Sequence, residues 1–184
     1  MRRRGLLAGA AVLALAGCAS PPARYYRLAA VPGAVHGGTG ARVGVRNVGL
    51  PGYLDQTNLP KPGGAYELDS FPNDLWAGSL APMLQAAMVQ DLAQRLPADT
   101  VLADGGAIGA APDVLVEIQI FHFEPDNAGT VTLTAQLATR PAASQDWRMQ
   151  TFTASAPGGT TPLGIVAVMS TLWGQAADVV AGLV

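Results

Sequence analysis

Alternating apolar and polar residues mark three consecutive strands in the second half of the chain. Between residues 113 and 123, four apolar side chains fall on one face and two polar ones on the other: Val114, Val116, Ile118 and Ile120 against Glu117 and Gln119. Residues 130–138 repeat this period of two, and residues 147–155 predict a third strand. Pro, Asp, Asn and Gly within residues 124–129 are typical of a hairpin turn. The pattern predicts an antiparallel meander.

Two longer segments follow steps of three and four residues, which predict amphipathic helices. The first covers residues 74–96, with either Asn73 or Asp74 as its cap. Pro82 either kinks this helix or lies in the first turn of a regular helix that begins near Ser79. The second covers residues 163–183, with Thr161 as its cap. It is apolar enough to suggest a membrane span, but Asp178 within it and the lack of a basic flank favour a buried helix.

The first half of the chain predicts shorter elements. Residues 24–28 and 42–48 have strand-like patterns, and residues 65–69 and 101–102 are candidates for further short strands. Residues 57–64 contain two prolines and two glycines and predict a loop.

The order strands, helix, strands, helix shows no repeat and no second domain. It predicts an α/β (α+β) fold, a two-layer sandwich in which two long helices pack against a mixed, largely antiparallel sheet. We expect a single domain at residues 24–184.

The N-terminal segment predicts export. Three arginines precede an apolar run at residues 6–16, which is shorter than the roughly 20 residues of a membrane span. Leu15-Ala16-Gly17-Cys18 resembles the lipobox of bacterial lipoproteins. The resemblance implies that residues 1–17 are a signal peptide, that Cys18 carries a diacylglycerol thioether and an acylated (palmitate) N-terminus, and that residues 18–23 are a lipidated tether. More than one acyl chain gives stable anchoring.

Two details of the N-terminal sequence bear on where the protein is located and how it is exported. Ala19 stands where an aspartate typically retains a lipoprotein in the inner membrane, so the resemblance implies the outer membrane, with the domain on its periplasmic face. Arg3-Arg4-Gly5-Leu6-Leu7 also resembles a twin-arginine signal, so Sec and twin-arginine export both stay open.

Composition and motifs offer little catalytic chemistry. Eleven basic against thirteen acidic residues argue against nucleic-acid binding. The single Cys excludes a disulfide framework and a Cys-based zinc site, and His36 and His122 form no metal-ligand pattern. Ser79 lacks the glycines of a nucleophile elbow, and residues 104–109 lack the Lys and Ser/Thr of a P-loop. We predict no catalytic residues, no metal and no cofactor besides the lipid on Cys18.

Four apolar residues allow two interpretations. Tyr53 and Leu54 follow a turn at Pro51-Gly52, while Phe71 and Trp76 flank the predicted helix start. Either they belong to the core or they form a patch that contacts a partner or lipid.

Several segments, in this order, are similar to the PqiC-like family of ABC-type transport auxiliary lipoproteins. They are the lipobox, Tyr25-Tyr26-Arg27-Leu28, Val43-Gly44-Val45, Leu50-Pro51-Gly52-Tyr53-Leu54-Asp55, Leu75-Trp76-Ala77 with Leu80, Asp91-Leu92-Ala93-Gln94-Arg95-Leu96, and Ile120-Phe121-His122-Phe123-Glu124. The chain departs from the family at Gln56, where a basic residue usually follows Tyr-Leu-Asp.

The resemblance implies a non-enzymatic adaptor at the outer membrane. Its implied partners are a periplasmic MCE-domain protein that forms a lipid conduit and an inner-membrane permease or ATPase. The candidate partner or lipid contacts are Tyr53, Leu54, Asp55, Phe71 and Trp76. Whether the protein forms a homo-oligomer is left open; conduits are usually symmetric assemblies, which makes one plausible.

Two alternatives remain beside the adaptor. A lipid carrier that holds acyl chains itself predicts an apolar pocket between the sheet and the helices. A lipoprotein hydrolase predicts that activity depends on His36 or His122.

Overall fold

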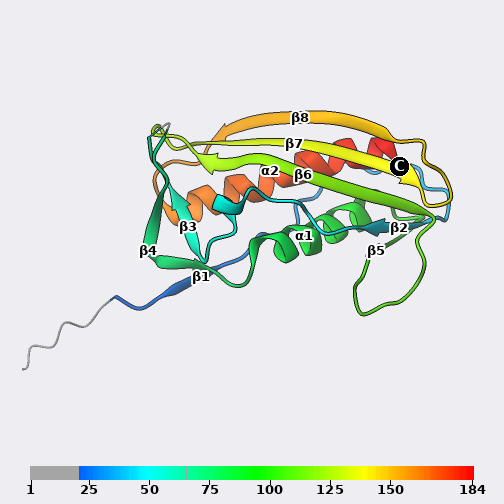
Figure 1. Cartoon of the computed structure of the whole chain (residues 1–184), viewed down its shortest axis with the longest axis horizontal. Coiled ribbons are helices and arrows are strands. Elements are labelled where there is room, and N and C mark those ends of the chain that lie inside the picture. Colours follow the sequence, from blue (N-terminus) through cyan, green and yellow to red (C-terminus); the bar gives the residue numbers. More distant parts are fainter. Residues whose placement is uncertain (1–20, 65) are drawn as a thin grey trace, which may run out of the picture.

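Two sheets and two long helices build the domain in the computed structural model, which describes residues 21–64 and 66–184 (Figure 1). The predicted α+β sandwich is confirmed. The elements in order are β1 (Arg24–Tyr26), β2 (Arg42–Val45), the 3-10 helix η2 (Gly52–Leu54), β3 (Asn58–Lys61), β4 (Asp69–Trp76), α1 (Leu80–Arg95), β5 (Thr100–Ala103), β6 (Val114–Pro125), β7 (Thr130–Pro141), β8 (Arg148–Pro157) and α2 (Pro162–Leu183).

The larger sheet has five strands in the order β5-β2-β6-β7-β8. The strands β6, β7 and β8 form the predicted antiparallel meander, whereas β2 pairs in parallel with both β5 and β6. Parallel neighbours need a crossover connection. The connection between β2 and β5 contains β3, β4 and α1, so the small sheet and the first helix lie inside one crossover.

A bulge in β6 changes which of its side chains face the core. Ile120 pairs with Ala135 and His122 pairs with Thr134, so Phe121 is an extra residue on this strand. Val116, Ile118 and Ile120 point inward as predicted, but after the bulge the inward position passes to Phe123, and Phe121 is exposed. The alternation of the sequence therefore holds only as far as Ile120.

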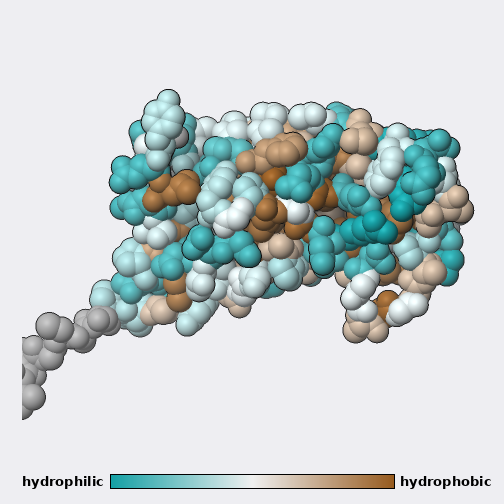
Figure 2. Space-filling model, viewed as in Figure 1, coloured by the Kyte–Doolittle hydropathy of each residue, from teal (hydrophilic) through white to brown (hydrophobic). Residues whose placement is uncertain are grey.

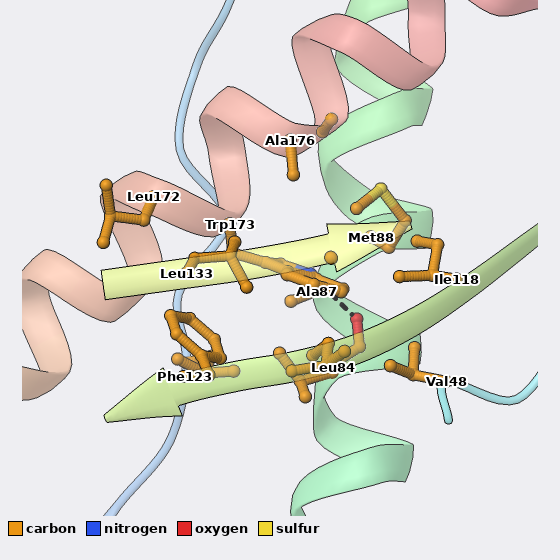
Figure 3. Close-up of a cluster of buried hydrophobic side chains, with 14 of the residues drawn as sticks. Val48, Leu84, Ala87, Met88, Ile118, Phe123, Leu133, Leu172, Trp173 and Ala176 are labelled. Carbon is orange, nitrogen blue, oxygen red and sulfur yellow. Dashed lines mark hydrogen bonds between the residues drawn. The ribbon is translucent and has the colours of Figure 1, made fainter. Parts of the chain in front are cut away.

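The core lies between the large sheet and the two helices (Figure 3). Trp173 of α2 stacks on Phe123 of β6 with ring centroids 6.2 Å apart, and its indole N–H donates to the Leu84 carbonyl of α1 over 3.1 Å. By length and composition α2 would suit a membrane span. Its apolar side chains instead pack against β7 and α1, so the interpretation as a buried helix is confirmed.

The first helix does not begin at residue 74, and the alternative prediction of a regular helix that begins near Ser79 is confirmed. Helix α1 begins at Leu80 with Ser79 as N-cap, and Pro82 lies in its first turn, where proline is tolerated. Residues 74–76 are strand instead of helix, and Asp74 caps nothing. Its carboxylate accepts a hydrogen bond from the Tyr26 hydroxyl at 2.8 Å and pairs with Arg24, which holds β1 beside β4.

Of three other local predictions, two were wrong and one is confirmed. Residues 58–61, predicted as loop, form strand β3, and its Pro60 is tolerated because β3 is an edge strand. Residues 66–68, predicted as strand, lie in the loop between β3 and β4. The Thr161 cap is confirmed, since its hydroxyl accepts from the Gly164 N–H at 3.2 Å.

The export and lipidation predictions fall outside the described residues. The signal peptide at 1–17 and Cys18 are not described, and the tether predicted at 18–23 is described only from Pro21.

Candidate functional site

One end of the molecule is formed by the three-stranded sheet β1-β4-β3, η2 and the β6–β7 turn at residues 126–129 (Figure 1). We call this region the hairpin end. On the face shown in Figure 2, apolar residues at this end lie as brown patches among hydrophilic ones.

Two neighbouring hollows open at the hairpin end. The first, of about 270 Å³, lies between η2, β3 and the start of α1, and its lining includes Tyr53, Leu54, Asn58, Leu80 and Glu124. The second, of about 350 Å³, lies between the β3–β4 loop and the β6–β7 turn. The two hollows share four lining residues: Pro60, Leu68, Asp69 and Glu124. The two hollows together present both apolar and acceptor groups.

Glu124 organises the polar part of this surface. The Tyr53 hydroxyl donates to its Oε1 at 3.0 Å, and the Phe123 N–H donates to its Oε2 at 2.8 Å. His122 Nδ1 lies 3.0 Å from the same Oε1. One carboxylate thus joins η2 to β6 and orients the imidazole, which is held at the rim of the second hollow.

The Tyr53 contact predicts a pH effect on stability. Burial, and next the neighbouring Glu124 carboxylate, raise the pKa of Tyr53 from 10.0 to about 12. The unfolded chain releases this proton at lower pH than the native state, so the native state binds more protons between pH 10 and 12. We therefore expect the contribution of Tyr53 to the free energy of unfolding to be present below pH 10 and to be lost as the pH rises toward 12.

Urea unfolding of the parent chain and of Tyr53→Phe across this pH range measures the effect. Tyr66→Phe is the matched control, since Tyr66 is fully exposed. The Tyr53→Phe variant should lose less stability with rising pH than the parent, whereas Tyr66→Phe should follow the parent. Parallel curves for the parent and Tyr53→Phe would refute the proposed role of the buried hydroxyl.

The structure separates the predicted contact residues into two groups. Leu54 and Trp76 are core residues, 6% and 2% exposed. Tyr53 and Phe71 are half-buried and pack against the core, while Asp55, which follows η2, is exposed. Tyr53, Asp55 and Phe71 are therefore the members of this set that are accessible at the surface, whereas Leu54 and Trp76 belong to the core.

Sequence reasoning missed several residues that build this end. Glu124 was noticed only within the resemblance motif, Asn58 was assigned to a loop, and Leu68 to a strand. Asn58 joins β3 to β4, since its side-chain N–H donates to the Phe71 carbonyl over 2.8 Å. These residues meet through the pairing of β3 with β4 and the bulge in β6, which leave no local signal.

The two histidines have different surroundings. His36 donates its backbone N–H to the Arg95 carbonyl over 2.7 Å, and its Nε2 is buried without a hydrogen-bond partner. Within residues 21–64 and 66–184, no hydrogen bond joins either histidine to a serine, threonine or cysteine side chain. The arrangement at the hairpin end is one of apolar side chains and acceptors around Tyr53 and Glu124.

This fold and its hollowed end define a small α+β domain. The model of the family described as ABC-type transport auxiliary lipoprotein component matches residues 26–181, and the chain belongs to this family. The resemblance seen in the sequence is thereby confirmed. The family is one of transport auxiliary lipoproteins.

Solved structures share the fold at low sequence identity. An uncharacterized protein matches with a TM-score of 0.74 and 18% identity, over 88% of this chain and 97% of the other. Protein XCC0632 from Xanthomonas campestris matches with a TM-score of 0.71 and 18% identity, over 88% of this chain and 94% of that one. Identities this low support the fold alone. No curated protein matches the chain.

Proposed function

We propose that this protein is an outer-membrane lipoprotein that serves as the periplasmic adaptor of an MCE-associated lipid transport system. The family match over residues 26–181 carries the proposal, and the lipobox ending at Cys18 supports it. In this role the domain holds the outer-membrane end of a lipid conduit, and an inner-membrane permease and ATPase supply the transport energy.

The packing of the domain favours an adaptor over a lipid carrier. Large side chains from β6, β7 and both helices fill the space between the layers and are fully buried, among them Phe123, Leu133, Leu84 and Trp173. The hollows at the hairpin end lie outside this core. A carrier needs an apolar cavity for acyl chains, whereas an adaptor needs an accessible surface.

The hairpin end is the surface that we assign to the partner. Half-buried aromatic residues near a ring of polar groups are typical of interface centres. Tyr53 and Phe71 supply the aromatic area, and Asp55 supplies an exposed charge. The partner surface that fits here is apolar at its centre and has hydrogen-bond donors for Glu124 and Asp55.

Co-purification of the intact lipidated protein from mildly solubilised envelopes tests the function, with mass spectrometry of the eluate. An MCE-domain protein and its inner-membrane permease in the eluate are the expected result. A protein that purifies alone with near-stoichiometric phospholipid would contradict the adaptor and support the carrier.

Charge reversal tests the assigned surface separately. We expect Asp55→Arg to lower partner recovery at least about tenfold, since a misplaced charge in an interface costs several kcal/mol. Asp146→Arg is the matched control, because Asp146 is also exposed but lies in the β7–β8 loop, at the opposite end of the large sheet. Equal recovery with both variants would leave the adaptor in place and remove the hairpin end as its docking surface.

A further inference from the structure

The edge strands of the two sheets differ in how well they are protected. Within residues 21–64 and 66–184, β5 and β8 are the edges of the large sheet, and β1 and β3 are the edges of the small one. A free edge presents a row of unpaired backbone N–H and C=O groups, to which another strand can pair. Proteins prevent such pairing with short edge strands, proline, charged side chains or bulges.

Three of these four edges have such protection. Strands β1, β3 and β5 are only three or four residues long. Strand β3 also contains Pro60 and Lys61, and its register against β4 is irregular. Strand β5 is followed directly by Asp104, which pairs with Arg46 at 3.2 Å. Each of these edges therefore offers few free groups to a further strand.

Strand β8 lacks this protection over most of its length. It has 10 residues and pairs with β7 in an unbroken register from Arg148 to Pro157. Between these two ends, residues 149–156 contain no charged side chain and no proline. Figure 1 shows β8 as the outermost strand of the large sheet, at the border of the molecule. Its outer edge is therefore suited to an extended strand.

The side chains of β8 leave room for such a strand. On the face of the sheet away from the helices, Thr151, Thr153 and Ser155 are exposed. On the helix face, Phe152 packs against the core but is only partly buried, whereas Ala135, its neighbour on β7, is fully buried. A further strand beside β8 would cover the open side of Phe152.

The charge pattern favours a second copy of this chain as that strand. When two identical strands pair antiparallel across a twofold axis, residues near the axis lie opposite themselves or close neighbours. A charge at the centre of β8 would then face its own copy, and like charges in opposite positions destabilise a sheet. The centre of β8 is uncharged, and Arg148 at one end would lie beside the other end of the second strand.

Helix α2 extends this uncharged surface. The helix contacts β8, and its exposed residues Leu163, Ala167, Thr171 and Gln175 carry no charge. Its Asp178 is bound to Arg95 within the same domain. A twofold axis perpendicular to the sheet keeps the helices of both copies on one side. The α2 helices of two copies could therefore approach each other without opposing charges.

We propose that this protein forms a twofold-symmetric dimer in which β8 of each copy pairs antiparallel with β8 of the other. The two large sheets then become one continuous sheet, with the helices of both copies on one face. The surface around η2 stays open in this dimer, because Tyr53 contacts β6, two strands away from β8. The dimer does not depend on the adaptor role.

Cysteine cross-linking in isolated envelopes tests this pairing. Thr151→Cys, Thr153→Cys and Ser155→Cys each place a thiol on the exposed face of β8. A bismaleimide with a span of about 8 Å reaches directly opposite residues and diagonal neighbours. Gln94→Cys is the matched control, since Gln94 is exposed on α1, which packs beside β5 at the other edge of the sheet. All variants keep Cys18, so linkage through that thiol would appear in the control too.

We expect a cross-linked dimer from at least one of the three β8 positions and none from Gln94→Cys. No dimer from any β8 position, or as much from the control, would overturn the pairing. Cross-linking of β8 to a different protein, without a dimer, would also overturn it and would identify the edge as a site for a foreign strand.

A lysine at the centre of β8 tests the same interface without a cross-linker. Thr153→Lys brings two like charges close to the twofold axis, so we expect self-association at least about tenfold weaker than in the parent chain. Gln94→Lys should associate like the parent. Sedimentation equilibrium of the intact protein in mild detergent measures both. A monomeric parent chain, or an oligomer that Thr153→Lys leaves unchanged, would contradict the proposed dimer.

Discussion

Replacing Arg95 with leucine is expected to lower the free energy of unfolding by about 3–5 kcal/mol, because it leaves a buried carboxylate without its cation. Arg95 is 1% exposed and lies at the C-terminal end of α1. Its Nε donates to Asp178 of α2 at 2.6 Å, and Nη1 lies 3.6 Å from the fully buried Asp91.

The same guanidinium holds the segment that leads from β1 to β2. Nη1 donates to the Val31 carbonyl at 2.9 Å and Nη2 to the Gly174 carbonyl at 2.9 Å. Asp91 accepts from the Val31 N–H at 2.7 Å, so the segment is bound through both its donor and its acceptor. Burial raises the pKa of Asp91, and its Oδ2 has no hydrogen-bond partner. The site already bears a desolvation cost, which Arg95→Leu would make worse.

Arg42→Leu is the control for this prediction. Arg42 pairs with Asp113 at 2.7 Å, but both side chains are about half exposed, and exposed pairs contribute about 0–1 kcal/mol. Urea denaturation followed by tryptophan fluorescence compares the two variants with the parent chain. If Arg95→Leu cost no more than Arg42→Leu, the buried cluster would not be the link between the two helices that the contacts indicate.

Replacing Cys18 with serine is expected to move the protein from the membrane to the soluble periplasmic fraction. A serine hydroxyl does not form the thioether, so under the proposed lipidation of Cys18 the variant would lack the acyl chains that anchor the protein. Separation of inner membrane, outer membrane and soluble fractions, followed by immunoblotting, measures the change.

Ala19→Asp is the matched control, since it keeps Cys18 and changes only the proposed sorting residue. By the resemblance to bacterial lipoproteins, this variant should move to the inner membrane. Retention of Cys18→Ser in the outer-membrane fraction would refute the lipobox assignment. Retention of Ala19→Asp there would refute only the sorting assignment.

Local patterns predicted the elements whose burial follows one regular period. The meander was predicted because apolar and polar residues alternate in β6 as far as Ile120 and in β7, and a turn signal joins these two strands. Helix α2 was evident because its apolar positions recur at helical spacing and Thr161 caps it. The family resemblance, too, lay in short motifs spaced along the chain, and the match over residues 26–181 confirms it.

The hairpin end was predicted less well because its elements depend on partners far away in sequence. Strand β4 exists because β1 and β3 pair with it, and Trp76 is a core residue of a strand although its spacing suits the helix that follows. The Tyr53–Glu124 hydrogen bond spans 71 positions of the chain. No window of sequence contains both partners.

The sequence by itself determined the α+β class, the meander, the second helix, and the family to which the chain belongs, because each of these rests on periodicity or on short motifs. Only the tertiary structure decided where α1 begins, how the bulge at Phe121 turns Phe123 inward, and how Arg95 joins two helices to the β1–β2 segment. It also brought η2, β3 and Glu124 together as one surface. Long-range pairing and desolvation govern these features, and both become visible only when distant residues meet.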